Sequence, residues 1–144
     1  MTYKIDISKQ AQADLRGIYE YIAYNLLSPQ SAAGQLDRLE EHIMGLNQMP
    51  MRFREYEREP WQSRGMRIMP VDNFVVMYIP NEEKCVVTII RVMYGGRDID
   101  TVSINKLTAE ELDSEIEKGY ADMLAGRTET ADKVFDDIRR DYGI

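Results

Sequence analysis

The pattern of apolar and polar residues predicts a strand followed by two helices in the first fifty residues. Residues 3–7 alternate apolar and polar side chains, as a half-buried strand does. After Ser8, a residue that can cap a helix, apolar side chains recur at helical spacing up to Leu27. Ser28-Pro29 is typical of the start of a second helix, whose apolar stripe ends near Leu46. Because the connection is short, we expect an antiparallel helix hairpin.

After Pro50 the apolar pattern changes to one typical of strands. Residues 51–64 are charged and aromatic and predict a loop. Three apolar runs follow, with turn-forming residues between them, at residues 65–69, 74–79 and 86–94. Short turns favour antiparallel pairing, so the order β-α-α-β-β-β predicts an α+β fold. The helix hairpin should pack on an antiparallel sheet that also includes the first strand.

Residues 101–144 predict two further helices. Thr108 and Glu111 have the spacing of a capping box, Ala125-Gly126 is a typical helix end, and Thr130 can cap the last helix. Each helix carries an apolar stripe, and the stripe residues are Leu112, Ile116, Tyr120, Val134, Phe135 and Ile138. Two amphipathic helices cannot bury such stripes alone. We therefore divide the chain into a body, residues 1–100, and a tail, residues 101–144, that wraps the body or a second copy.

The net charge of −7 by itself argues against a nucleic acid as partner, but the charge is unevenly distributed. The body holds 12 basic and 14 acidic residues, whereas the tail holds 6 and 11. Seven arginines lie between Arg52 and Arg97. We expect the acidic tail and this arginine cluster to attract each other. Arg139 or Arg140 should be exposed or pair with glutamates of residues 55–59.

Several function classes are disfavoured by the composition. A single cysteine, Cys85, allows no internal disulfide and no cysteine-based metal cluster, and we expect it to be a small buried strand residue. No run approaches the roughly 18 apolar residues of a membrane span, and the chain does not open like a signal peptide. We expect a cytoplasmic protein without cofactor, metal or membrane contact.

Four segments, taken in order, resemble the RelE/ParE superfamily of type II toxin–antitoxin toxins over residues 2–100. They are residues 13–23, Met49-Pro50, residues 67–78 and the string Ile90-Arg91-Val92-Met93-Tyr94-Gly95-Gly96-Arg97-Asp98-Ile99. The last string is the most specific of the four. The resemblance implies a bacterial toxin that inhibits growth and has an antitoxin as partner.

The tail resembles the C-terminal part of RelB/Phd-type antitoxins, through residues 117–128 and 134–141. In that family this segment wraps the cognate toxin. The resemblance implies that the tail masks and neutralises the body, either within one chain or by exchange between two chains of a homodimer.

RelE-like members of the superfamily cleave mRNA on the ribosome, without a metal, through attack of a 2′-hydroxyl on the adjacent phosphate. This chemistry needs cations around the phosphate and groups that move protons. The resemblance makes Arg64, Arg67, Tyr94 and Arg97 the candidate catalytic residues, because arginine can bind phosphate oxygens in two places. Arg64 and Arg67 could equally form salt bridges with the tail, and Arg91 should be structural.

One departure from the nuclease pattern favours another branch of the superfamily. Such nucleases usually carry an arginine where this chain has the apolar residues Phe74 and Val75. That apolar version resembles the ParE branch, whose members inhibit DNA gyrase and are not enzymes. Three functions therefore stand: a ribosome-dependent mRNA endonuclease, which the retained arginines and Tyr94 favour, a gyrase inhibitor, and an inert, self-neutralised complex.

Overall fold

The computed structural model describes residues 2–95 and 107–144, and it confirms the predicted α+β order. The strands are β1 (Lys4–Ser8), β2 (Arg67–Val71), β3 (Phe74–Asn81), β4 (Val86–Tyr94) and β5 (Thr128–Thr130). The helices are α1 (Lys9–Glu20), α2 (Pro29–Met44), α3 (Ala109–Ala125) and α4 (Ala131–Tyr142). A π-helical turn at Tyr21–Asn25 continues α1, and short 3-10 turns lie at Gly45–Asn47 and Pro50–Arg52.

The strands form one five-stranded sheet in the order β2-β3-β4-β1-β5. The pairs β2–β3, β3–β4 and β1–β5 are antiparallel. The pair β1–β4 is parallel, with Ile7 opposite Ile89, so the predicted antiparallel sheet holds for every pair except this one. A parallel pair needs a long crossover connection, and the whole stretch between β1 and β4 supplies it here. The three-residue strand β5 was not predicted.

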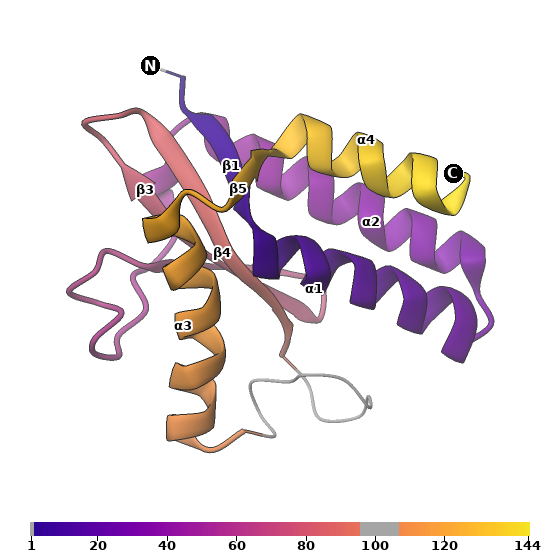
Figure 1. Ribbon diagram of the computed structural model, residues 1–144, viewed down its shortest axis with the longest axis horizontal. Coiled ribbons are helices and arrows are strands. Elements are labelled where there is room, and N and C mark those ends of the chain that lie inside the picture. Colours follow the sequence, from indigo (N-terminus) through magenta and orange to yellow (C-terminus); the bar gives the residue numbers. More distant parts are fainter. Residues whose placement is uncertain (1, 96–106) are drawn as a thin grey trace.

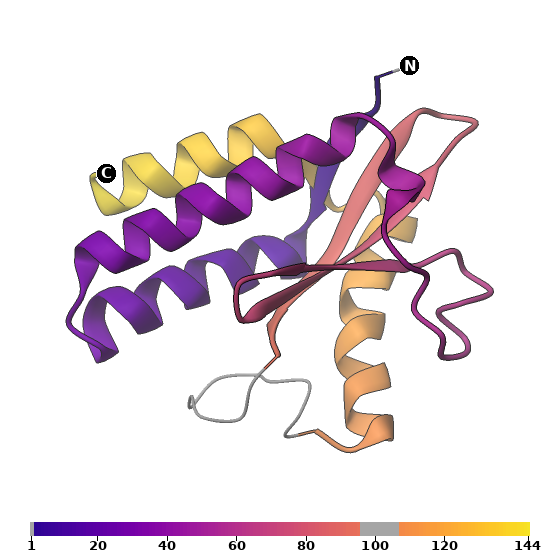
Figure 2. The ribbon, with the colours of Figure 1, turned by 180° about the vertical axis from the view of Figure 1, so that it is seen from behind.

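The sheet is covered by helices on both faces (Figures 1 and 2). Helices α1, α2 and α4 lie on one face, and α3 lies alone on the other. The first face buries one large apolar core, which includes Leu15 of α1, Leu39 of α2 and Phe135 of α4. The second face buries a smaller core around Trp61 and Ile116. The tail thus contributes to both cores.

Local sequence signals explain where the helices begin and end. The Ser8 hydroxyl accepts a hydrogen bond from the backbone N–H of Ala11 and caps α1. The predicted capping box between Thr108 and Glu111 opens α3, and Gly126, with φ of +75°, ends it. Thr130 precedes α4 as predicted, but its side chain makes no capping hydrogen bond.

Two details of the strand prediction were wrong. The run predicted at residues 65–69 begins at Arg67 instead, because Gly65 has φ of +81° and belongs to the preceding turn. Cys85 is half-buried and lies in the turn before β4 rather than inside a strand. Its φ of +53° is incompatible with strand geometry.

Candidate functional site

Helix α3 is held on the sheet by its apolar stripe. Leu112 and Ile116 are buried in the second core, and Tyr120 is half-buried beside them. Their neighbours include Trp61 of the loop before β2, which is fully buried. The Tyr120 ring meets the Trp61 ring edge-on, at 5.8 Å between centroids. Trp61 is therefore the anchor of this contact between the body and the tail.

Gly119 marks the point where α3 crosses β4. A Cβ atom at this position would lie 2.1 Å from the carbonyl oxygen of Ile90, which is far inside contact distance. Ile90 itself lies at an irregularity of the β3–β4 ladder, where Met77 faces Arg91 and Tyr78 faces Ile89. Only glycine permits the two backbones to approach so closely.

One flank of α3 binds two arginines of the loop before β2. Arg58 donates two hydrogen bonds to the carboxylate of Asp113, at 3.0 and 2.8 Å, and Trp61 Nε1 donates a third, at 3.0 Å. The hydrogen bond from Arg58 lowers the pKa of Asp113 below its ordinary value. Arg64 pairs with Glu117 at 2.9 Å, and its guanidinium lies 4.9 Å from the centre of the Trp61 ring. The predicted attraction between tail carboxylates and body arginines is present here.

The other flank of α3 meets Arg91 and the start of α1. Arg91 Nε and Nη2 each donate a 2.7 Å hydrogen bond to Asp14 of α1, and Nη1 donates to the backbone carbonyl of Glu115. The Arg91 side chain is 1% exposed, and each of its three nitrogens donates a hydrogen bond. This agrees with the structural role expected for Arg91. Burial raises the pKa of Asp14, and the Arg91 hydrogen bonds oppose this rise. Asp122 accepts a hydrogen bond from the N–H of Gln10, at the positive end of α1.

Of the four candidate catalytic residues, the structure describes Arg64, Arg67 and Tyr94, and it does not bring these three together. Arg64 lies on the α3 face of the sheet, as described above. Arg67 donates to the backbone carbonyls of Met51 (3.1 Å) and Phe53 (2.7 Å), so it fastens the loop before β2. Tyr94 packs against the core of the opposite face. Arg97 lies outside the described residues.

The Tyr94 ring borders cavities lined by apolar side chains, by the amides of Gln35 and Asn73, and by the carboxylate of Asp14. The ring meets Phe74 edge-on, at 5.5 Å between centroids. Two small adjacent cavities of about 200 and 220 Å³ border both rings, and other side chains that line them include Ile18 and Leu26. Within the described part of the chain, neither cavity is lined by an arginine or a lysine. The site suits an apolar contact better than a phosphate.

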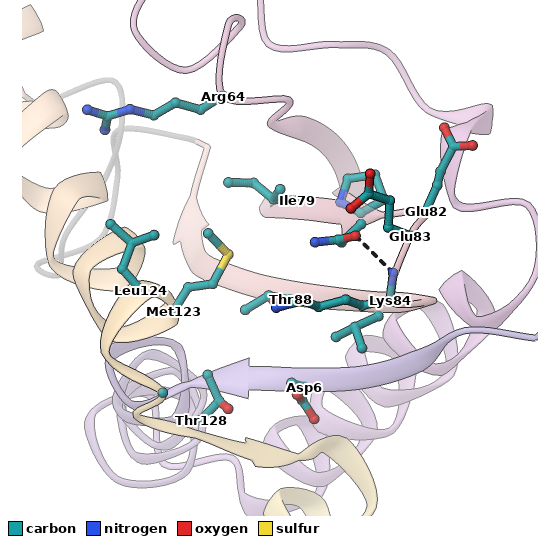
Figure 3. Close-up of a pocket in the computed structure, with 14 residues that line it drawn as sticks. Asp6, Arg64, Ile79, Glu82, Glu83, Lys84, Thr88, Met123, Leu124 and Thr128 are labelled. Atoms are coloured by element: carbon teal, nitrogen blue, oxygen red, sulfur yellow. Dashed lines mark hydrogen bonds between the residues drawn. The ribbon is translucent and has the colours of Figure 1, made fainter.

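A larger, open cavity of about 800 Å³ lies beside the C-terminal end of α3 (Figure 3). Met123 and Leu124 of α3 line one side, Arg64 another, and the β3–β4 turn with Lys84 closes the far side. Acidic and basic side chains are mixed around it, so it has no single charge preference. It shows that α3 covers only part of this face of the sheet.

Arg58 and Asp14 are among the residues of this site that were not predicted from the sequence. Arg58 lies in a loop whose charges follow no period, so no pattern in the sequence could distinguish it. Asp14 carried a usable signal, because it lies three residues after Ala11 on the apolar side of α1. A carboxylate in such a position has to be paired when it is buried.

The outer tail helix contacts the helix hairpin. Arg139 pairs with Asp37 and Glu40 of α2, both at 2.6 Å, so the pairing with residues 55–59, one of the two alternatives expected, is not the one found. The reason is that α4 and that loop lie on opposite faces of the sheet. Arg140 is exposed, as expected.

The described residues place further limits on the chemistry. Within residues 2–95 and 107–144, no three His, Cys, Asp or Glu side chains gather as a metal site would require. No described helix has the length and apolar character needed to cross a membrane.

Comparison with known proteins supports the fold and identifies a family. The family model described as the ParE toxin of the type II toxin–antitoxin system parDE matches residues 5–99. The chromosomal ParDE system from P. aeruginosa is 19% identical, with a TM-score of 0.55, over 66% of this chain and 98% of that one. The E. coli toxin RelE, as a mutant in the free state, is 14% identical, with a TM-score of 0.52, over 82% and 98%. No curated protein sequence is significantly similar to the chain.

Proposed function

Since this chain belongs to the ParE toxin family of type II toxin–antitoxin systems, we propose that it inhibits growth by binding DNA gyrase and not by cutting mRNA. The observation that supports the proposal is the separation of two candidate catalytic residues, Arg64 and Tyr94. Arg64 contacts α3 on one face of the sheet, and Tyr94 packs into the core on the other. A nuclease needs its cation and its proton-moving group around the same phosphate.

Two further arginines of the body support the same proposal. Arg67 donates to backbone carbonyls and Arg91 donates to the buried carboxylate of Asp14, so neither is available to a phosphate. Where the nucleases carry an arginine, this chain has Val75 or nearby Phe74; Phe74 is buried in the main core, and Val75 is half-buried against the second core. The body carries 12 basic and 14 acidic residues, a weak basis for docking on ribosomal RNA.

The tail supports a second part of the proposal, namely that it serves as the antitoxin in cis. It buries Trp61 and Ile116 in one apolar core and pairs Asp113 and Glu117 with Arg58 and Arg64. An antitoxin on a separate chain would have to displace α3 to reach this surface. As folded, the toxin is therefore silent.

The test compares gyrase supercoiling with mRNA integrity during in-vitro translation. It uses the full chain and a Gly119→Ala variant, in which the new Cβ pushes α3 away from Ile90. Gly17→Ala is the matched control, because a Cβ there meets no atom within 4 Å. We expect Gly119→Ala to inhibit supercoiling and to leave mRNA intact, and the other two proteins to do neither.

Codon-linked cuts in mRNA, with normal supercoiling, would overturn the proposal in favour of the RelE-like alternative. If Gly119→Ala affects neither process, although α3 is released, the chain is better described as an inert complex.

A further inference from the structure

We infer that the sheet face beneath α3 is a docking site for one acidic amphipathic helix, and that α3 fills it as a hinged, exchangeable cover. In the same inference, β5 and α4 stay in place when α3 leaves. The docking site follows from the contacts of α3 with the sheet and the loop before β2; only its consequence for toxicity rests on the proposed function.

The segment β5–α4 is built into the body. Val134, Phe135 and Ile138 are buried in the same apolar core as α1 and α2. Strand β5 pairs with β1, where Ile7 faces Glu129. Arg139 adds its two ion pairs with α2. Removing this segment would open the main core and the edge of β1, so it belongs to the permanent fold.

Helix α3 is attached by fewer buried apolar side chains and by more polar contacts. Its buried apolar side chains are Leu112 and Ile116, whereas Leu124 on its outer side is exposed. Glu115 and Asp122 add hydrogen bonds with Arg91 and with the N–H of Gln10. Its pairs with Arg58 and Arg64 involve side chains that are about one third exposed, at 34% and 31%. Such pairs are weakened by water and salt, unlike a buried core. Helix α3 can therefore leave while the rest of the fold persists.

A hinge lies at the right place for this motion. Gly126 has φ of +75°, and a Cβ there would meet nothing within 4 Å. The next residue, Arg127, accepts a hydrogen bond from the N–H of Lys9 at its carbonyl oxygen and so begins the fixed segment. A change in the Gly126 backbone would swing α3 and release Asp122 from Gln10 and Arg127, without breaking the β1–β5 pairing.

The contacts of α3 define what the site recognises. Two carboxylates four residues apart, Asp113 and Glu117, meet Arg58 and Arg64. A glycine is required where the helix crosses Ile90. A helix that competes with α3 must therefore combine an apolar stripe, an acidic flank and a small crossing residue. When α3 leaves, the cavity loses its Met123 and Leu124 side, and its remaining wall, with Arg64 and Lys84, joins the freed surface (Figure 3).

The experiment measures binding of a fluorescent peptide of residues 107–126 to three full-length proteins. These are the unchanged chain, Gly119→Ala, whose own α3 is displaced, and Gly17→Ala, the matched control. We expect the peptide to bind Gly119→Ala at least tenfold more tightly than either of the others. A peptide carrying Asp113→Lys and Glu117→Lys should not bind.

Hydrogen exchange on the same proteins checks the fixed segment. In Gly119→Ala, the amides of α3 should lose protection while those of α4 keep it. If Gly119→Ala fails to fold, Asp113→Lys with Glu117→Lys in the full chain replaces it, because these changes weaken the contact without a steric clash.

Two results would overturn the inference. One is equal peptide affinity for all three proteins, which would mean that α3 does not occupy the site. The other is loss of protection in α3 and α4 together. Neither gyrase nor mRNA is present in these assays, so a failure of the proposed function leaves their outcome unaffected.

Discussion

The substitution Phe135→Ala tests whether α4 is part of the permanent fold. The Phe135 ring is fully buried in the core shared by α1, α2 and α4. Replacing a buried phenylalanine with alanine costs about 3–5 kcal/mol, from lost burial and from the cavity that remains. For a chain of this size each kcal/mol lowers Tm by about 2–4 °C, so we expect a fall of roughly 6–20 °C.

The assay is thermal unfolding followed by circular dichroism, with two companion variants. Leu124→Ala, at a side chain that is 69% exposed, should change stability by less than about 0.5 kcal/mol. Ile116→Ala removes a buried side chain of α3, yet it should lower Tm less than Phe135→Ala, because α3 can detach first. If Phe135→Ala lowers Tm no more than Leu124→Ala does, α4 is not part of the permanent fold.

Three further predictions concern the site. Arg91→Met leaves the buried carboxylate of Asp14 without its partner, so the free energy of unfolding in urea should fall by about 3–5 kcal/mol. Adding Asp14→Leu should recover part of this loss of stability. A fall below about 1 kcal/mol would contradict the buried pair. Since the pKa of Asp113 is lowered in the folded state, its contribution to α3 docking is present above its ordinary pKa of 3.8 and is lost as pH falls through the lowered value. Trp61, the single tryptophan, should report this loss as a fluorescence change below about pH 4 and not near neutrality, where a transition would contradict the assignment. Tyr94→Phe should leave growth inhibition by the Gly119→Ala chain intact, because the Tyr94 ring acts by packing; loss of inhibition with normal folding would point back to catalysis.

The periodicity of the sequence was sufficient to predict most of the elements. The apolar stripes of α1 and α2 and the short turns between β2, β3 and β4 follow from local rules, and the structure agrees with them. The capping box at Thr108 was equally readable, because it depends on residues three apart in sequence. These features share one property: each is decided by neighbours along the chain.

The features that the sequence did not reveal depend on contacts between distant segments. The parallel pairing of β1 with β4 depends on how the helix hairpin returns the chain to the sheet, and no local pattern encodes that. Strand β5 is only three residues long, too short for a detectable alternation. The partners of Arg58, Arg64 and Arg139 depend on which face of the sheet each tail helix covers.

The tail has two parts, the removable cover α3 and the fixed helix α4, and hydrogen exchange of the unchanged full chain distinguishes them. We expect α3 amides to exchange through a local opening, faster than the amides of β4, and α4 amides to exchange as slowly as those of β4. Equal protection of α3 and α4, with both exchanging only on global unfolding, would contradict this division of the tail.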